Sequence, residues 1–162
     1  METIKFMTSL LTFYLKGEIK HKQNFIKLKI PNTILSIIPL GSENETIPIN
    51  HISSVGTNFH LLFKNFVIGI LVAIISFACF SDSVLLGLIL LFIGISMVIN
   101  SFQSILTINT TSGDAIYLSF FIFEKSKAIQ AEQHINQLIS DRLDDTNNRQ
   151  QTDRIIDAIN NK

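Results

Sequence analysis

The sequence predicts an α+β membrane protein in which a helical hairpin interrupts a β-rich domain. Three observations predict this fold class. Two long apolar runs, 66–80 and 84–102, are separated by only three residues, 81–83. Short segments with strand-like alternation lie before and after these runs. An amphipathic helical segment follows the last of them, so strands and helices are segregated rather than alternating.

The composition agrees with a membrane segment in the middle of the chain. Charged residues make up 16% of the 162 residues, below the roughly 25% of ordinary globular domains. Asp82 is the one charged residue between positions 65 and 103. Thirteen basic and thirteen acidic residues give a net charge of zero, which argues against nucleic acid as a partner. A single cysteine, Cys79, excludes an intramolecular disulfide.

The segments before the hairpin are predicted to be strands. Residues 25–30, FIKLKI, alternate between apolar and lysine, which is typical of a half-buried strand. Residues 33–40 form a second β-rich run, 41–45 a polar turn, and 46–49 a strand end with Pro48. Residues 50–55 lead toward the hairpin.

The first apolar segment, 6–15, is short and is followed by Lys16, Gly17 and Glu18. No small-residue cleavage site follows it, so it does not have the pattern of a cleaved signal peptide. A first strand or an interfacial helix is expected there.

The hairpin is long enough to cross a bilayer when its flanks are counted. With residues 59–65 the first run reaches 22 residues, and the second has 19. A helix needs about 20 apolar residues to cross a bilayer. Two spans, at about 61–80 and 84–102, are therefore expected. The alternative is the buried hairpin of a globular domain, but the remaining chain is too short to cover both helices.

Small residues and lysines supply further expectations for the hairpin. Gly69, Ala73, Gly87 and Gly94 are predicted to form a helix-packing face, although small residues are also simply common in such helices. Lys64 is predicted to anchor the first helix at the membrane interface. The connecting loop has no basic residue, so both termini are expected on the cytoplasmic side of the cell membrane.

After the hairpin, the pattern predicts a strand at 104–110, a tight turn at 111–114 and a partner strand at 115–123. A helix is expected at 126–143 and a disordered linker at 144–151, with a short helix in the tail. The predicted organisation is given by four segments: N-terminal strands at 1–58, the transmembrane hairpin at 59–102, strands and closing helix at 103–143, and a polar tail at 144–162.

The strand before the hairpin and the turn after it carry a family resemblance. Residues 47–55, IPINHISSV, then the hairpin, then 106–108, LTI, and 111–114, TSGD, resemble the pattern of bacterial pleckstrin-homology-like (PH-like) domains. The chain is similar over roughly residues 15–143 to small membrane proteins in which two spans are inserted into such a domain. The resemblance implies a PH-like barrel or sandwich, split by the hairpin and closed by a C-terminal helix.

The sequence contains no catalytic pattern, and no enzyme activity, cofactor or metal is expected. Its four histidines have no metal-ligand spacing, and there is no phosphate-binding loop. The polar residues inside the apolar runs, Ser76, Ser96 and Asn100, do not make a set. Lys20, Lys22, Lys27 and Lys29 are predicted to form a face for anionic lipid, the alternative being an ordinary polar strand face.

Two functions are expected for such a protein. The resemblance extends to bacteriocin self-immunity proteins of Gram-positive bacteria, which implies protection against a membrane-active peptide toxin. The alternative is an adaptor that binds a membrane protein or anionic lipid. Membrane lipids are the expected partners in both cases.

Overall fold

Seven strands form two antiparallel sheets in the computed structural model, which describes residues 3–34 and 38–160. The first sheet has the order β1-β2-β3-β4 and consists of β1 (Thr3–Met7), β2 (Lys16–Lys22), β3 (Phe25–Ile34) and β4 (Ile38–Pro48). The second has the order β5-β6-β7 and consists of β5 (Ile52–Leu61), β6 (Phe102–Thr110) and β7 (Ala115–Phe121). Short 3₁₀ turns, η1 (Ile49–His51) and η2 (Ile122–Glu124), follow β4 and β7.

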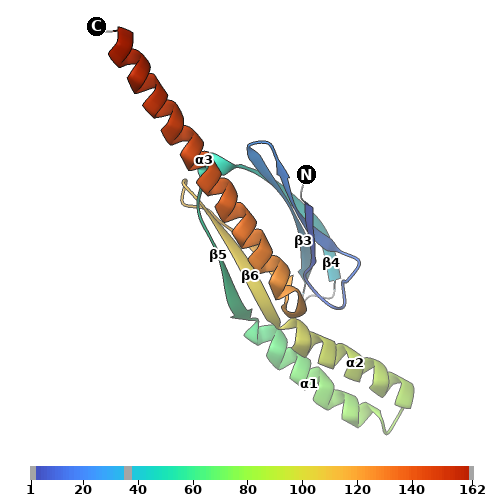
Figure 1. Ribbon diagram of the computed structural model, residues 1–162. Coiled ribbons are helices and arrows are strands. Elements are labelled where there is room, and N and C mark those ends of the chain that lie inside the picture. Colours follow the sequence, from blue (N-terminus) through green and yellow to red (C-terminus); the bar gives the residue numbers. More distant parts are fainter. Residues whose placement is uncertain (1–2, 35–37, 161–162) are drawn as a thin grey trace.

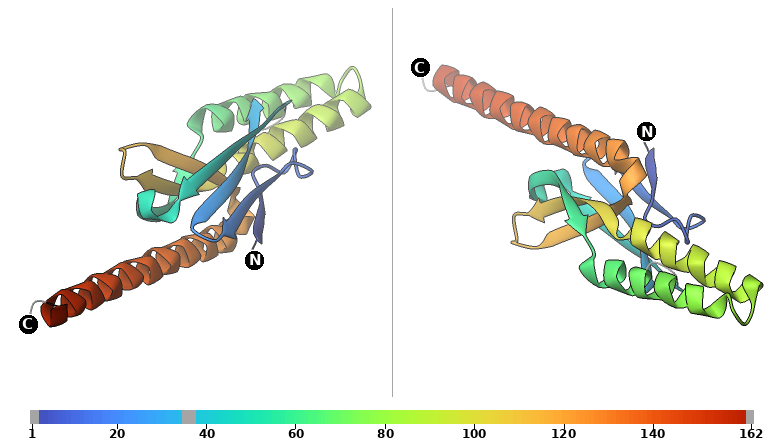
Figure 2. Two further views of the ribbon diagram at one scale, coloured as in Figure 1. Left: turned by 90° about the horizontal axis from the view of Figure 1, so that it is seen from above. Right: turned by 90° about the horizontal axis from the view of Figure 1, so that it is seen from below.

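Three α-helices complete the described residues: α1 (Phe63–Cys79), α2 (Val84–Asn100) and α3 (Lys125–Asn160). Figure 1 shows α1 and α2 lying side by side at one end of the sheets, while α3 runs along the sheets and projects from the opposite end. Both views of Figure 2 also show the helix pair and the end of α3 pointing in opposite directions. The class is therefore α+β.

The core lies between the two sheets because strand alternation turns one face of each sheet inward. In β3, Ile26 and Leu28 are buried while Lys27 and Lys29 are exposed. The rings of Phe6 and Phe120 stack across the core with centroids 4.0 Å apart. Gly17 lies beneath the Phe6 ring, which leaves no room for a Cβ atom at this position.

The first half of α3 closes the space between the sheets. Ala128, Ala131 and Ile135 are 0%, 0% and 1% exposed and belong to the core. Their spacing of three and four residues places them on one helix face. The small alanines let the helix approach the strands closely.

The transmembrane hairpin predicted from the sequence is contradicted. Within the described ranges, no helix is both long and apolar enough to cross a membrane. The reason lies in the flanks: β5 continues to Leu61, which pairs with Phe102, so α1 begins only at Phe63 and α2 ends at Asn100. Each helix has 17 residues, which is about 25 Å of helix against the roughly 30 Å of a hydrocarbon core.

The fold class and location inferred from that hairpin are wrong for the same reason. A domain split by two membrane spans at about 61–80 and 84–102 does not agree with helices of this length. The expectation of a two-span protein of the cell membrane, with both termini cytoplasmic, is overturned with it.

Three local predictions also differ from the structure. The segment 6–15, expected to be a first strand or an interfacial helix, contains only the end of β1, and residues 8–15 form an irregular loop. The expected turn at 41–45 is part of β4, because residues 42–45 pair with β3 in register from Pro31 to Leu28. The expected disordered linker at 144–151 is helical and belongs to the continuous helix α3. No glycine or proline occurs between 125 and 160, so nothing in this segment breaks the helix.

Candidate functional site

The α1/α2 pair has an inverted distribution of polar and apolar side chains. The residues buried in the pair are glycine, serine, methionine and asparagine: Gly69 and Ser76 on α1, and Gly87, Gly94, Ser96, Met97 and Asn100 on α2. The large apolar side chains point outward. In an ordinary helix of a water-exposed domain the apolar stripe faces the core instead.

The outward side chains form what we call the apolar surface. Seven large apolar residues on each helix are more than a third exposed: Phe63, Val67, Ile70, Leu71, Ile74, Ile75 and Phe77 on α1, and Val84, Leu85, Leu86, Leu88, Ile89, Phe92 and Ile95 on α2. Monomeric proteins rarely expose a contiguous apolar patch of more than a few hundred Å² unless it is an interaction site. The apolar surface is therefore the candidate functional site.

Three of the predicted packing residues lie in the contact between the helices. A Cβ atom at Gly94 would lie 2.7 Å from the backbone nitrogen of Ala73. A Cβ atom at Gly69 would lie 2.9 Å from the backbone nitrogen of Val98 and 3.0 Å from the carbonyl oxygen of Gly94. Backbone meets backbone here, so the helices approach as closely as their small residues allow. The fourth residue, Gly87, lies against the ring of Phe80 near the tip of the pair.

Three polar side chains of the pair, Ser76, Ser96 and Asn100, are buried within it. The hydroxyl of Ser76 donates to the carbonyl of Ala73 at 2.6 Å. Asn100, at the base, accepts a hydrogen bond at Oδ1 from the backbone N–H of Leu10 at 2.7 Å. Ser76, Ser96 and Asn100 thus share an inward position, which their scattered places in the sequence do not indicate.

The base of the pair is held by the backbone and surrounded by aromatic rings. The N–H of Leu62 donates to the carbonyl of Ser101 at 2.9 Å, joining the start of α1 to the end of α2. Phe102 contacts Phe59 and Phe66, with centroids 6.4 Å and 5.9 Å away. Lys64, predicted as an interface anchor, is exposed in the first turn of α1.

The predicted lysine face lies on the outer side of the first sheet. Lys20 faces Lys27 across the β2–β3 ladder, and Lys29 faces Glu18. Glu18 also binds Lys20 at 2.5 Å and Lys5 at 3.5 Å. The hydrogen bond and charge of Lys20, with the charge of Lys5, lower the pKa of Glu18.

The face is thus partly neutralised by Glu18. Lys22, opposite Phe25, completes the predicted set at the far end of β2. Contact of these four lysines with anionic lipid stays a prediction.

Glu45 is the other carboxylate with a shifted pKa. It pairs with Leu28 in the β3–β4 ladder and thus lies on the inward side of the sheet. Burial raises its pKa, and the charges of Glu43 and Asp114 raise it further.

No family model matches the chain, and no curated protein or solved structure matches it either. The resemblance to PH-like membrane proteins therefore stays a prediction. The apolar surface is the feature of the structure that points to a function.

Replacing Gly94 by alanine should destabilise the pair. The added methyl group meets the backbone of Ala73, which has little freedom to move, and overpacking of this kind costs about 1–3 kcal/mol. The better helix propensity of alanine returns at most about 1 kcal/mol. Gly56→Ala in strand β5 is a control for the added methyl group alone, since nothing lies within 4 Å of its Cβ position. Denaturant unfolding in mild detergent measures both variants, and equal stability would contradict the close contact.

Replacing Glu45 by glutamine should stabilise the protein at neutral pH. A raised pKa means that the folded state binds the proton more tightly than the unfolded state, so Glu45 lowers stability once the pH rises above its ordinary pKa of 4.5. Glu45→Gln should therefore melt at a higher temperature than the parent at pH 7, with the difference vanishing near pH 4. Glu18→Gln is the opposite control. Its lowered pKa stabilises the fold above pH 4.5, so this variant should melt lower at pH 7.

Proposed function

We propose that the chain is a non-enzymatic binding protein whose apolar surface enters a lipid layer from one side, without crossing it, and holds the α+β domain there. The inverted polarity of the α1/α2 pair carries this proposal. Burying small and polar residues between helices while exposing leucine, isoleucine and phenylalanine is favourable where the surroundings are as apolar as the side chains.

Lipid fits the apolar surface better than a protein groove does. A groove covers one side of a helix and leaves the opposite side to water, so a docking helix carries one apolar stripe. Here both helices expose apolar residues over most of their length, from Phe63 to Phe77 and from Val84 to Ile95. A lipid layer covers such a surface on all sides at once.

The residues at the base of the pair support the same partner. Phe59 and Phe63 are 61% and 69% exposed, and Lys64 is exposed beside them. Lysine side chains reach the headgroups while their stems cover apolar surface, and phenylalanine is common on the apolar face of helices that lie in the membrane interface. They occur where the helices end and the strands begin, the level at which a lipid layer would give way to water.

Replacing Ile74 and Phe92 together by serine should abolish most vesicle binding. Each loses about 1.5–3 kcal/mol of apolar transfer, so the partition coefficient should fall about 100-fold or more. The two side chains are 60% and 63% exposed, and Leu143→Ser on α3, at 60%, is the matched control. Flotation of the full chain with phosphatidylcholine vesicles measures it. Equal binding of both variants would contradict the proposal, as would a dimer that covers the apolar surface and leaves vesicles unbound.

Labelling of the single thiol tests, with the same vesicles, whether the helix pair crosses the lipid layer. Cys79 ends α1, next to the tip of the pair. A membrane-impermeant maleimide enclosed inside sealed vesicles should leave it unlabelled, whereas the same reagent added outside should label it. Labelling from the inside would overturn entry without crossing.

The self-immunity role implied by the resemblance stays a prediction, as does the adaptor role. A strain that lacks the chain should be killed by the spent medium of its parent and rescued by a plasmid copy. If protection uses the apolar surface, the Ile74→Ser/Phe92→Ser copy should fail to rescue while the Leu143→Ser copy succeeds. Normal growth of the deletion strain in that medium would exclude self-immunity under those conditions.

A further inference from the structure

The loop between β1 and β2, residues 8–15, has the same inverted polarity as the helix pair. Thr8, Ser9 and Thr12 are 7%, 1% and 0% exposed. The large side chains point outward, with Leu10 at 38%, Phe13 at 63% and Tyr14 at 59%. The Phe13 and Tyr14 rings contact each other edge to face, with centroids 6.0 Å apart. A second segment of the chain thus exposes its apolar side chains and buries its polar ones.

Asn100 fixes this loop to the base of the helix pair. It is the last residue of α2, is 0% exposed, and accepts the backbone N–H of Leu10 at 2.7 Å. Both views of Figure 2 show the loop beside the base of α2. The loop and the apolar surface therefore lie at the same end of the molecule.

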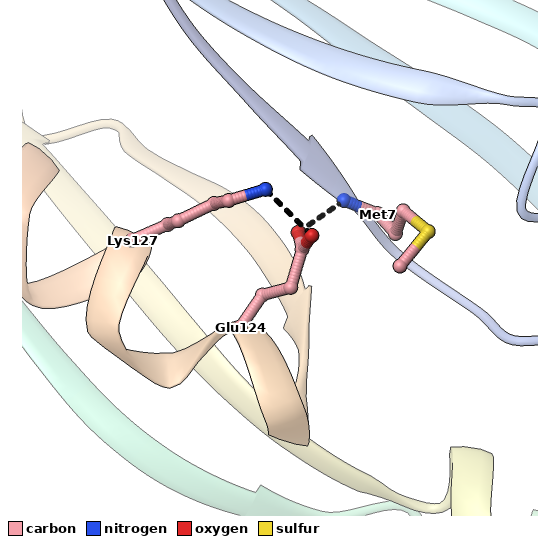
Figure 3. A network of polar contacts seen from close by, with 3 residues as sticks. All are labelled: Met7, Glu124 and Lys127. Atoms are coloured by element: carbon pink, nitrogen blue, oxygen red, sulfur yellow. Dashed lines mark hydrogen bonds and ion pairs between the residues drawn. The ribbon is translucent and has the colours of Figure 1, made fainter.

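The strand that leads into the loop is fixed as well. The carboxylate of Glu124 accepts the N–H of Met7 at 2.6 Å and pairs with Lys127 at 2.6 Å, as Figure 3 shows. Met7 ends β1 immediately before the loop. Within the loop, the N–H of Leu15 donates to the carbonyl of Thr12 at 2.9 Å, closing a turn. The exposed rings are thus carried by a loop with defined attachments.

We propose that the 8–15 loop is a second lipid contact, which enters the same lipid layer as the helix pair and is held at a set depth by Asn100. The inference rests on the proposed function. Its own support is the continuity of the two apolar regions through the Asn100–Leu10 hydrogen bond and the inverted polarity of the loop. Tyr14 adds the amphipathic ring that is favoured at headgroup level. Asn100 is a positioning residue, because it acts on lipid only through the loop.

The absence of tryptophan from the sequence gives a direct test. Phe13→Trp places a single emitter on the loop, and Phe25→Trp places one at the far end of β3, where Phe25 is 42% exposed. On binding to vesicles that contain brominated lipid, the emission of Phe13→Trp should shift to the blue and be quenched at least twofold. The emission of Phe25→Trp should stay as in buffer.

The outcomes separate this inference from the proposed function. If the full chain floats with vesicles but Phe13→Trp is not quenched, the helix pair binds lipid and the loop does not, so the inference fails alone. If the full chain does not float, both fail. Phe13→Ser/Tyr14→Ser should also lower vesicle partition about tenfold or more, while Phe25→Ser leaves it unchanged.

The role of Asn100 is tested in the Phe13→Trp background. Asn100→Ala removes the acceptor for the Leu10 N–H, so tryptophan quenching should fall while flotation through the apolar surface persists. Ser96→Ala is the control, since Ser96 is also buried on α2, at 2% exposed, and is not the acceptor of the loop N–H. Equal quenching in the Asn100→Ala and Ser96→Ala variants would overturn the positioning role.

Discussion

The pairing of β5 with β6 is the constraint on which the rest of the structure depends. The ladder runs without interruption from Ser54 opposite Asn109 to Leu61 opposite Phe102. It joins segments from before and after the helix pair into one sheet, so the core needs both. It also brings the start of α1 and the end of α2 together, where Leu62 bonds to Ser101. The two helices are thereby placed side by side, and their length is limited because residues up to 61 and from 102 onward belong to strands.

The residues between α1 and α2 are small, so the two helices pack closely while their large apolar side chains point outward. Gly69, Ala73 and Gly94 let the backbones meet, and close packing replaces the usual burial of large side chains. Such a contact gains little from the hydrophobic effect, because the leucines and isoleucines stay outside. An apolar partner that covers these side chains would therefore add to the stability of the pair, because a ligand that binds only the folded state stabilises it.

Three features were predictable because each follows a periodic pattern of apolar or small residues in the sequence. They are the strand around Ile26 and Leu28, the helix at Ala128 and Ala131, and the small residues in the contact between α1 and α2. The helix limits were not predictable. Residues 59–62 and 101–102 are apolar enough for either a helix or a strand, and only the pairing of β5 with β6 decides between them. Residues 42–45 are polar, but their pairing with β3 makes them part of a strand. The segment 6–15 was noticed as apolar but expected to be a strand or an interfacial helix, because the inverted polarity of the 8–15 loop is visible only once burial is known.

Asp82 constrains how the pair can lie in lipid. It is exposed at the tip, between Ser81 and Ser83, whose hydroxyl accepts the N–H of Leu86. An upright pair inserted fully would carry this carboxylate about 25 Å into a hydrocarbon core of roughly 30 Å. An upright pair inserted halfway would leave it near the centre of the core, where a charge costs about 2.5–3.5 kcal/mol. An oblique pair keeps the tip near the headgroups while acyl chains surround the rest of the apolar surface. The 8–15 loop, fixed beside α2 by Asn100, gives the domain the second contact that such an oblique position requires.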